Sequence, residues 1–320
     1  QVFKAWKSYW ASIKDYKKNP QKYKGEPKAP KYKDKEGYNL TIFPSQNLKI
    51  KDGYIHFPKS TKLEPIKTKV NIDDIDQVRI TPQATCFVVE IIYEREEKKH
   101  ENISEENVLM IDLGVKNIVT ATDNVGNRPF IINGGKIKSI NQYFNKKLAK
   151  LMSYIGNKGT SNRINKLFHK RGNKMEDGMH KISNFILQYC LFYGIGTVVI
   201  GKNDGWKQDV NLGDKTNQSF VQIPHAKLIN KITYKLALHG IKVICQEEAH
   251  TSKCDHLAYE TIEKHSVYLG KRKRRVLFQS IIGKLINADV NGSIGIGLKS
   301  KVVRNGREFI QNLLNTGQAF

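Results

Sequence analysis

Residues 108–117 read Val-Leu-Met-Ile-Asp-Leu-Gly-Val-Lys-Asn, four apolar residues that lead into a single aspartate, Asp112. An apolar run bounded by turn residues predicts a buried strand. A carboxylate at the end of such a strand is costly to bury unless something compensates for its charge. A divalent cation is the usual partner at such a position, and the alternative is an aspartate that only caps its own turn.

The elements predicted after this strand follow the order of a ribonuclease H-like α/β fold. Strands are expected over residues 118–122 and 128–133, which with the first strand form an antiparallel meander. Helices are expected over 139–155 and 177–193, with a basic connection between them, then a strand over 197–200, a helix over 220–239 and a strand over 241–245. In this topology the first strand is central, and later elements bring acids beside it. Asp112 and Asp289 are therefore predicted neighbours.

The region before residue 108 has a different character. Apolar residues at helical spacing predict an amphipathic helix over 1–18, and a stretch rich in lysine, tyrosine and proline follows. Short strands separated by glycine, proline and aspartate turns predict a small β-barrel. We predict domains at 1–37, 38–107 and 108–320, with a basic insert at 249–284 in the last one.

Charge and composition restrict the possible partners. The chain has 54 lysines and arginines against 30 aspartates and glutamates, a formal net charge of +24. Such an excess favours a polyanionic partner, and nucleic acid is the default. No apolar run is long enough to span a membrane, and the four cysteines have no paired spacing, as expected for a reducing cytoplasm.

Five motifs occur in an order that resembles the TnpB (OrfB) family, which bacterial and archaeal insertion sequences encode and which is related to type V CRISPR effectors. They are residues 111–117, Trp206-Lys207-Gln208, Gln222-Ile223-Pro224, Thr251-Ser252-Lys253 and residues 287–292. The resemblance implies a RuvC-like nuclease domain after a β-barrel and the end of a helical recognition region. It also implies that the start of the natural protein is missing from this sequence.

By this resemblance, clustered carboxylates hold Mg²⁺ or Mn²⁺, and Asp112 and Asp289 are two of the ligands. Most members carry a third acid, a glutamate, after the strand that here ends at Ile200, but this chain has Gly201-Lys202-Asn203 there. We expect Glu247 or Glu248 to replace it, because neighbouring parallel strands end at the same sheet edge. The face shared with Val243 and Cys245 favours Glu247. Two solvated acids are the alternative.

The region after the Thr-Ser motif also departs from the family. Typical members carry two CxxC pairs there, whereas Cys254 stands alone, so we expect no structural zinc. The basic run at 271–275 is expected to neutralise phosphates. The predicted nucleic-acid-binding residues are Lys116, Asn117, Lys207, Gln208, Lys271, Arg272, Lys273, Arg274 and Arg275.

The predicted function is that of an RNA-guided DNA endonuclease that hydrolyses phosphodiesters with two metal ions. Its predicted partners are target DNA and a transposon-derived guide RNA, in the cytoplasm of a bacterium or archaeon, and the oligomeric state is not predicted. The alternative is a nuclease-inactive relative that binds RNA and DNA as a regulator or transposition accessory protein. The missing glutamate after Ile200 favours this alternative, whereas the retained Asp112 and Asp289 oppose it.

Overall fold

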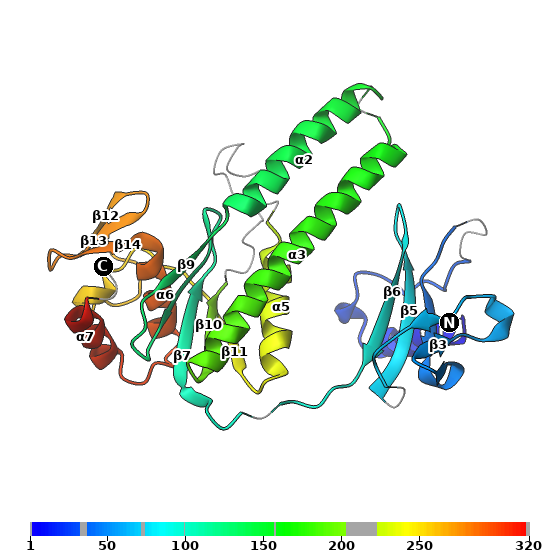
Figure 1. The fold of residues 1–320 in the computed structure, drawn as a ribbon, viewed down its shortest axis with the longest axis horizontal. Coiled ribbons are helices and arrows are strands. Elements are labelled where there is room, and N and C mark those ends of the chain that lie inside the picture. The colour runs from blue at the N-terminus through cyan, green and yellow to red at the C-terminus, as the bar shows by residue number, and fades with distance from the viewer. Residues whose placement is uncertain are drawn as a thin grey trace. The chain divides into compact units, whose positions relative to one another are not determined.

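The computed structural model describes residues 2–32, 37–71, 74–98, 100–156, 158–202 and 223–317 of the 320-residue chain. The chain divides into two compact units, Gln1–Glu94 and Arg95–Phe320 (Figure 1). Each unit has a hydrophobic core of its own. No described helix combines the length and the apolar character needed to cross a membrane.

The first unit consists of an exposed helix and short strands. The helix α1 (Val2–Lys18) lies where it was predicted and buries none of its residues. The strands are β1 (Thr41–Pro44), β2 (Lys49–Lys51), β3 (Tyr54–His56), β4 (Ile66–Lys67), β5 (Ile75–Pro82) and β6 (Phe87–Tyr93). They form two three-stranded antiparallel sheets, β1-β5-β6 and β2-β3-β4, in the region predicted as a small barrel. Both sheets contribute to one core around Phe43, Ile55 and Val78.

The second unit is built on a five-stranded sheet. Its strands are β7 (Ser104–Asp112), β8 (Asn117–Asp123), β9 (Phe130–Asn133), β10 (Ile195–Gly201) and β11 (Lys242–Gln246). They lie in the order β11-β10-β7-β8-β9, with β7 antiparallel to β8 and parallel to β10. This order, with β7 in the centre, confirms the predicted ribonuclease H-like topology.

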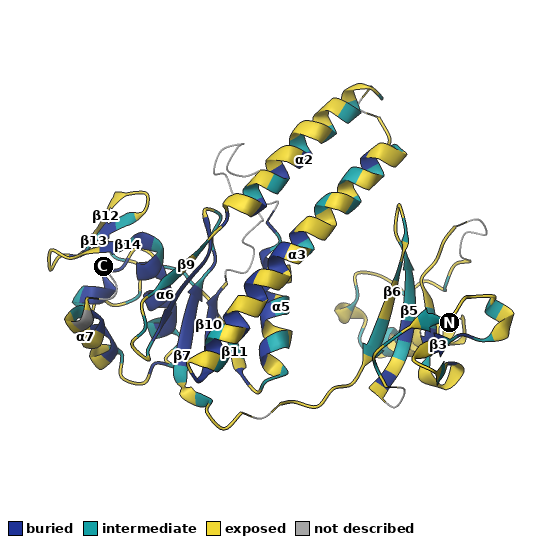
Figure 2. Cartoon of the chain, viewed as in Figure 1, coloured by how far each residue is buried: buried dark blue, intermediate teal, exposed yellow. Residues whose placement is uncertain are grey.

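The helices of this unit are α2 (Gly135–Ser153), α3 (Asn162–Phe192), α5 (His225–Ala237), α6 (Ala288–Lys299) and α7 (Gly306–Thr316). Helices α3 and α5 pack on one face of the sheet and α6 and α7 on the other, whereas most of α2 and the first part of α3 extend beyond the sheet (Figures 1 and 2). Successive residues of a strand point to opposite faces. Leu109 and Ile111 therefore join the core formed with α3 and α5, whereas Val108 and Met110 join the core formed with α6 and α7. By the same alternation, Asp112 lies on the α6 face.

Several boundaries differ from the sequence prediction, and two of these differences change how a segment is interpreted. The basic connection expected before residue 177 is the first half of α3, which starts at Asn162 after the N-cap Ser161. Its apolar residues pack against α2, with the Phe168 ring 4.9 Å from that of Phe144, and this packing makes the segment helical despite its charge. Strand β7 starts at Ser104, inside the range 38–107 that was assigned to the β-barrel domain, because it pairs there with Ile195 of β10.

The basic insert predicted at 249–284 is folded. A short 3₁₀ helix, η5 (His256–Ala258), is followed by the strands β12 (Lys271–Arg274), β13 (Leu277–Gln279) and β14 (Leu285–Asn287). These strands form an antiparallel sheet of their own in the order β12-β13-β14. Phe278 anchors this sheet to the α6 core, and β14 runs directly into α6. The insert therefore positions the start of α6.

Candidate functional site

Three acids from different elements approach one another at the carboxyl edge of the central sheet. Asp112 ends β7, Glu248 follows β11 by two residues, and Asp289 lies in the first turn of α6. Because β7, β10 and β11 are parallel, with Ile200 of β10 opposite Ile111 of β7, their carboxyl ends meet at this edge. The predicted proximity of Asp112 and Asp289 thus follows from the topology.

Helix α6 passes close to Asp112. A β-carbon on Gly292 would lie 2.9 Å from Oδ2 of Asp112, so a larger residue would collide with the carboxylate. The first turn of α6 is fixed by Asn287, whose side chain accepts hydrogen bonds from the backbone amides of Asp289 and Val290 at 2.9 and 3.4 Å. The helix start therefore holds Asp289 at the same edge as Asp112.

Negative charge accumulates at this edge. Asp112 keeps some exposure to solvent, but burial of its carboxyl group, and then the charges of Glu248 and Asp289, raise its pKa to about 8. The guanidinium of Arg272 acts in the opposite direction. Burial, and then the charge of Glu247, raise the pKa of Glu248 to about 7. Carboxyl groups whose pKa is raised by burial and by neighbouring acids are typical of functional sites.

Of the two glutamates after β11, the structure places Glu248 beside Asp112 and Glu247 away from it. Glu247 is exposed, pairs with Lys299 and accepts a hydrogen bond from the backbone amide of Ala249 at 2.8 Å. The preference for Glu247 relied on the face of Val243, but Val243 packs toward α3 and α5, on the opposite side of the sheet from Asp112. The face of β11 that carries Val243 is therefore not the face of the site.

Gly201 makes room for Glu248. A β-carbon at Gly201 would lie 2.6 Å from Oε2 of Glu248, so the glutamate side chain lies over the end of β10. This is the end of the strand after which the family resemblance led us to expect a glutamate. A carboxylate from the neighbouring strand therefore occupies space that a side chain on residue 201 would fill.

Asp289 has two polar neighbours. Nδ2 of Asn117 donates a hydrogen bond to its Oδ2 at 2.8 Å, and Nη2 of Arg272 lies 3.8 Å from its Oδ1. Asn117 was predicted to contact nucleic acid, but it is buried, with 8% of its surface exposed, and its amide is directed at Asp289. Lys116, the other predicted contact in this turn, is exposed.

The basic run of the insert lies on its exposed edge strand. Lys271, Arg272, Lys273, Arg274 and Arg275 are all exposed, and the first four form β12. Arg272 connects this strand to the acidic edge through Asp289. The predicted contacts Lys207 and Gln208, together with Trp206, fall outside the described residues.

Within the described ranges, no group of three or more histidine, cysteine, aspartate or glutamate side chains is arranged to hold a metal ion. Asp112, Glu248 and Asp289 nevertheless offer hard oxygen donors, which suit Mg²⁺ and Mn²⁺. Burial and the charges of the other two acids raise the pKa of Asp112, so a cation at this edge would stabilise its charged form. The chemistry of these donors thus fits a divalent cation, but the three side chains must move closer together to share one.

Sequence reasoning missed His225. This histidine is buried at the start of α5, and its Nε2 lies 3.1 Å from the carbonyl oxygen of Gly114. The contact connects α5 to the turn that follows Asp112. The only signal was its position, directly after the Gln222-Ile223-Pro224 motif.

Two family models match the chain. One, described as OrfB_IS605, probable transposase, matches residues 90–207, which include Asp112. The other, described as Cas12f1-like, TNB domain, matches residues 225–296, which include Glu248 and Asp289. No curated protein matches the chain in sequence.

Three solved structures resemble the chain at low sequence identity. A Cas12f1–sgRNA–target DNA complex matches with a TM-score of 0.50 and 14% identity, over 80% of this chain and 58% of that chain. A CRISPR-Cas12f ternary complex matches with a TM-score of 0.45 and 16% identity, over 69% and 45%. The mini-RNA-guided endonuclease CRISPR-Cas_phi3 matches with a TM-score of 0.43 and 12% identity, over 77% and 54%. The chain thus spans less than two thirds of the length of these proteins, and the first match shows the fold.

Proposed function

The chain belongs to the TnpB (OrfB) family, as its motifs predicted, and from this premise we propose that it is an RNA-guided endonuclease that hydrolyses DNA. One observation carries the proposal. Three acids from β7, the end of β11 and the start of α6 approach one edge of a ribonuclease H-like sheet, where two of them raise the pKa of the third. A purely structural role would not require a buried carboxyl group, that of Asp112, to lie beside two further acids.

Asp112, Glu248 and Asp289 would hold Mg²⁺ or Mn²⁺ at this edge. Bound there, such ions supply an attacking water of lowered pKa and stabilise the leaving oxygen. The residues of the chain do the positioning. Asn117 orients Asp289 through its 2.8 Å hydrogen bond, and Arg272 carries a half-exposed guanidinium beside the same acid, where it can contact a phosphate.

The partners follow from family membership and charge. We propose that a transposon-derived RNA pairs with target DNA, so that sequence is read by base pairing and the protein holds the backbone. The five exposed cations of residues 271–275 are suited to that task because each can neutralise a phosphate. This activity would take place in the cytoplasm of a bacterium or archaeon.

The direct test compares Glu248→Gln with Glu247→Gln, two isosteric changes at adjacent positions. The protein is co-expressed with the RNA from its transposon end and incubated with target DNA in Mg²⁺. Glu248→Gln should reduce cleavage by about 10²- to 10³-fold, because it removes an anionic ligand at the reacting centre. Glu247→Gln should cleave within about two-fold of wild type, because that side chain pairs with Lys299.

Equal cleavage by the two variants would remove Glu248 from the site. Absence of cleavage by the wild-type complex, together with tight RNA-dependent DNA binding, would instead support the nuclease-inactive regulator. Failure to bind RNA would contradict both functions.

A further inference from the structure

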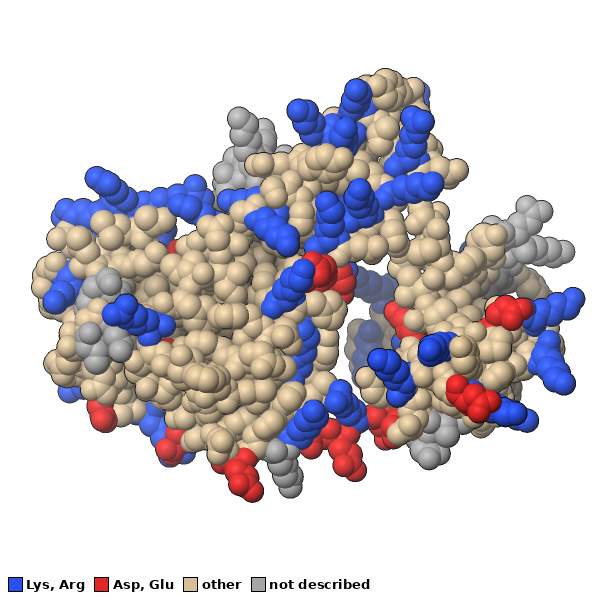
Figure 3. Space-filling view, in the orientation of Figure 1, with Lys and Arg blue, Asp and Glu red and all other residues tan. Residues whose placement is uncertain are grey.

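The helical pair α2–α3 carries a concentration of positive charge apart from the acidic edge. Residues 124–175 contain twelve lysines and arginines and no aspartate or glutamate. Lysine and arginine side chains cover the pair in the space-filling view, at the top of Figure 3. Solvated helices usually alternate charges of both signs, because opposite charges at i,i+4 support the helix. The segment 124–175, which holds α2 and the first half of α3, has no such support before Glu176 and Asp177, and a polyanionic ligand would compensate for it.

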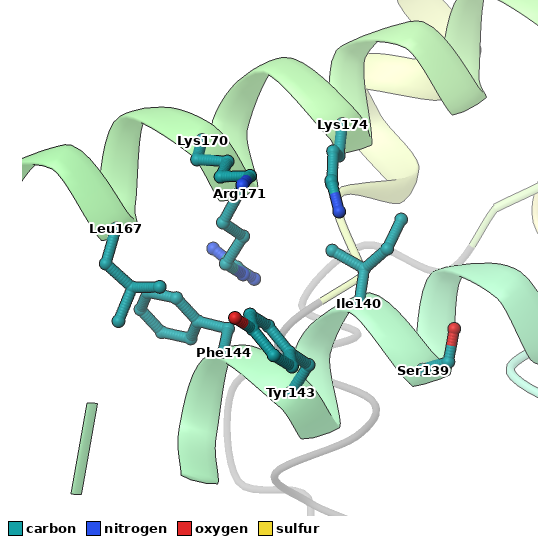
Figure 4. A pocket seen from close by; sticks show the side chains of 8 residues that line it. All are labelled: Ser139, Ile140, Tyr143, Phe144, Leu167, Lys170, Arg171 and Lys174. Carbon is teal, nitrogen blue, oxygen red and sulfur yellow. The ribbon is translucent and has the colours of Figure 1, made fainter. Parts of the chain in front are cut away.

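A hollow lies between the two helices at the middle of this pair (Figure 4). Its volume is about 290 Å³, and its walls are Tyr143 and Ile140 from α2 and Leu167 from α3. Arg171 lies 4.9 Å from the centre of the Phe144 ring, and its Nε donates a hydrogen bond to Asn141 at 2.8 Å. Arg171 and Phe144, which line the hollow, are therefore held in place by side-chain contacts.

A second hollow of about 490 Å³ shares the walls Tyr143, Leu167 and Lys170 with the first, so the two form one groove. The amines of the rim come from Lys174 at one end and from Lys147 and Lys166 at the other. Tyr143 is 53% exposed, and the amine of Lys147 lies 5.8 Å above its ring. We call this feature the α2–α3 groove. Exposed aromatic faces between rows of cations are the platform on which unpaired bases stack while lysines hold the backbone.

The base of the helical pair is anchored at the acidic edge. The backbone amide of Gly134, the residue before α2, donates a hydrogen bond to the carbonyl oxygen of Lys116 at 2.8 Å. Lys116 precedes Asn117, which contacts Asp289. At 1.5 Å per residue, Tyr143 lies roughly 12 Å along the helix axis from the start of α2. A strand in the groove would therefore need only a few nucleotides to reach the acids.

We propose that the α2–α3 groove binds an unpaired segment of the DNA strand that is cut, with one base stacked on Tyr143 and the flanking phosphates on Lys166 and Lys170. This assignment rests on the proposed nuclease function, because DNA rather than RNA is the strand that must continue to the acids. The groove would be a second binding surface, because none of the three acids lies on α2 or α3. The groove keeps this segment single-stranded and directs it toward Asp112.

The test measures oligo-dT binding by the RNA-loaded protein in EDTA, with Asp112→Asn present in every variant to prevent cutting. Tyr143→Ala should weaken binding about 10-fold, whereas Tyr143→Phe, which keeps the ring, should not. Lys166→Ala with Lys170→Ala should lower the salt dependence of binding by roughly 1.4 in log–log slope, for two lost phosphate contacts on a single strand. The matched control is Lys136→Ala with Lys146→Ala, which removes two exposed lysines of α2 that line neither hollow.

Three results would overturn the proposal. The first is equal oligo-dT binding by Tyr143→Ala and Tyr143→Phe. The second is an equal change in salt dependence for the double lysine variant of the groove and for the control double variant. The third is a loss of RNA loading in place of a loss of oligo-dT binding, which would make RNA the occupant. Because binding is measured without cleavage, a wild-type complex that fails to cut DNA contradicts the nuclease function alone.

Discussion

The second unit contains two acidic clusters that are stabilised in opposite ways. At the sheet edge, Asp112 faces Glu248 and Asp289, and burial together with their charges raises its pKa. In the insert, Oδ2 of Asp255 accepts hydrogen bonds from Oγ of Ser280 at 2.7 Å and from the backbone amide of Ile281 at 2.8 Å.

Glu260 completes the insert cluster. Its carboxylate accepts hydrogen bonds from the backbone amides of Asp255 at 2.6 Å and of Leu269 at 2.9 Å. A buried carboxylate supplied with donors stabilises the fold, whereas one that faces other carboxylates costs stability until a cation arrives. The insert cluster is therefore supplied with donors by the fold, whereas the sheet-edge cluster contains the acids that we propose as metal ligands.

The largest effect is expected when the sheet-edge cluster is broken. Asp112→Asn should reduce DNA cleavage by at least about 10³-fold, because it removes a charge at the centre of the acidic edge. The same change should leave the protein as stable as wild type in EDTA, or more stable by about 1 kcal/mol, since like-charge repulsion and charge burial are relieved. Single-turnover cleavage and urea unfolding provide the two measurements. Lower stability in EDTA would place Asp112 among the structural acids.

The second prediction concerns the structural cluster. Asp255→Ala should lower the free energy of unfolding by about 2–4 kcal/mol, because the hydroxyl of Ser280 and the amide of Ile281 lose their acceptor in a buried setting. Asp177→Ala is the control, since it breaks an exposed i,i+4 pair with Lys181 and should leave the free energy of unfolding nearly unchanged. Equal losses in urea unfolding would contradict the contrast between the two clusters.

These clusters also show how far the sequence could be interpreted. The apolar run before Asp112 and the order of elements predicted the central strand and brought Asp289 beside it, because topology alone joins the strand ends. The choice between Glu247 and Glu248 required knowing which face of β11 meets α6, and both faces carry apolar residues. The role of Gly201 depends on a close approach in space that no local pattern reveals.

The insert was the least predictable part. Its cysteine spacing spoke against zinc, but nothing in the sequence indicated that Asp255 and Glu260 would accept hydrogen bonds from residues up to 26 positions away. The helical character of residues 162–176 was hidden for a different reason. Their lysines resemble a solvated connection until α2 provides a surface for Ile164 and Phe168.

The third prediction concerns how the stability of the insert depends on pH. His256 is buried, and its Nε2 lies 2.6 Å from the carbonyl oxygen of Thr251. Burial lowers its pKa from 6.5, so the folded state favours the neutral ring while the unfolded chain takes up a proton first. The stability from this group is complete above pH 6.5 and is lost as the pH falls below it, with a limiting slope of about 1.4 kcal/mol per pH unit. Urea unfolding between pH 5 and 7.5 measures this slope.

His256→Asn provides the comparison for this measurement. The variant should be less stable at pH 7.5, since it vacates a buried position, but its stability should fall less steeply between pH 6.5 and 5 than that of wild type. If both proteins showed the same slope, another group would carry the pH dependence. The insert would then differ from the sheet edge only in its hydrogen bonds.

The smallest effect is expected at Arg272, an insert residue that lies beside the sheet-edge cluster. This residue belongs to the insert but lies 3.8 Å from Asp289, whereas Lys273 is its exposed neighbour on the same strand. Arg272→Ala should slow cleavage at saturating DNA by about five- to ten-fold, because a cation beside the reacting phosphate is lost. Lys273→Ala should weaken DNA binding slightly and leave that rate unchanged, since it removes only a phosphate contact. Should both variants change binding alone, β12 would serve as a general phosphate contact, and the insert would contribute to the site only by positioning α6.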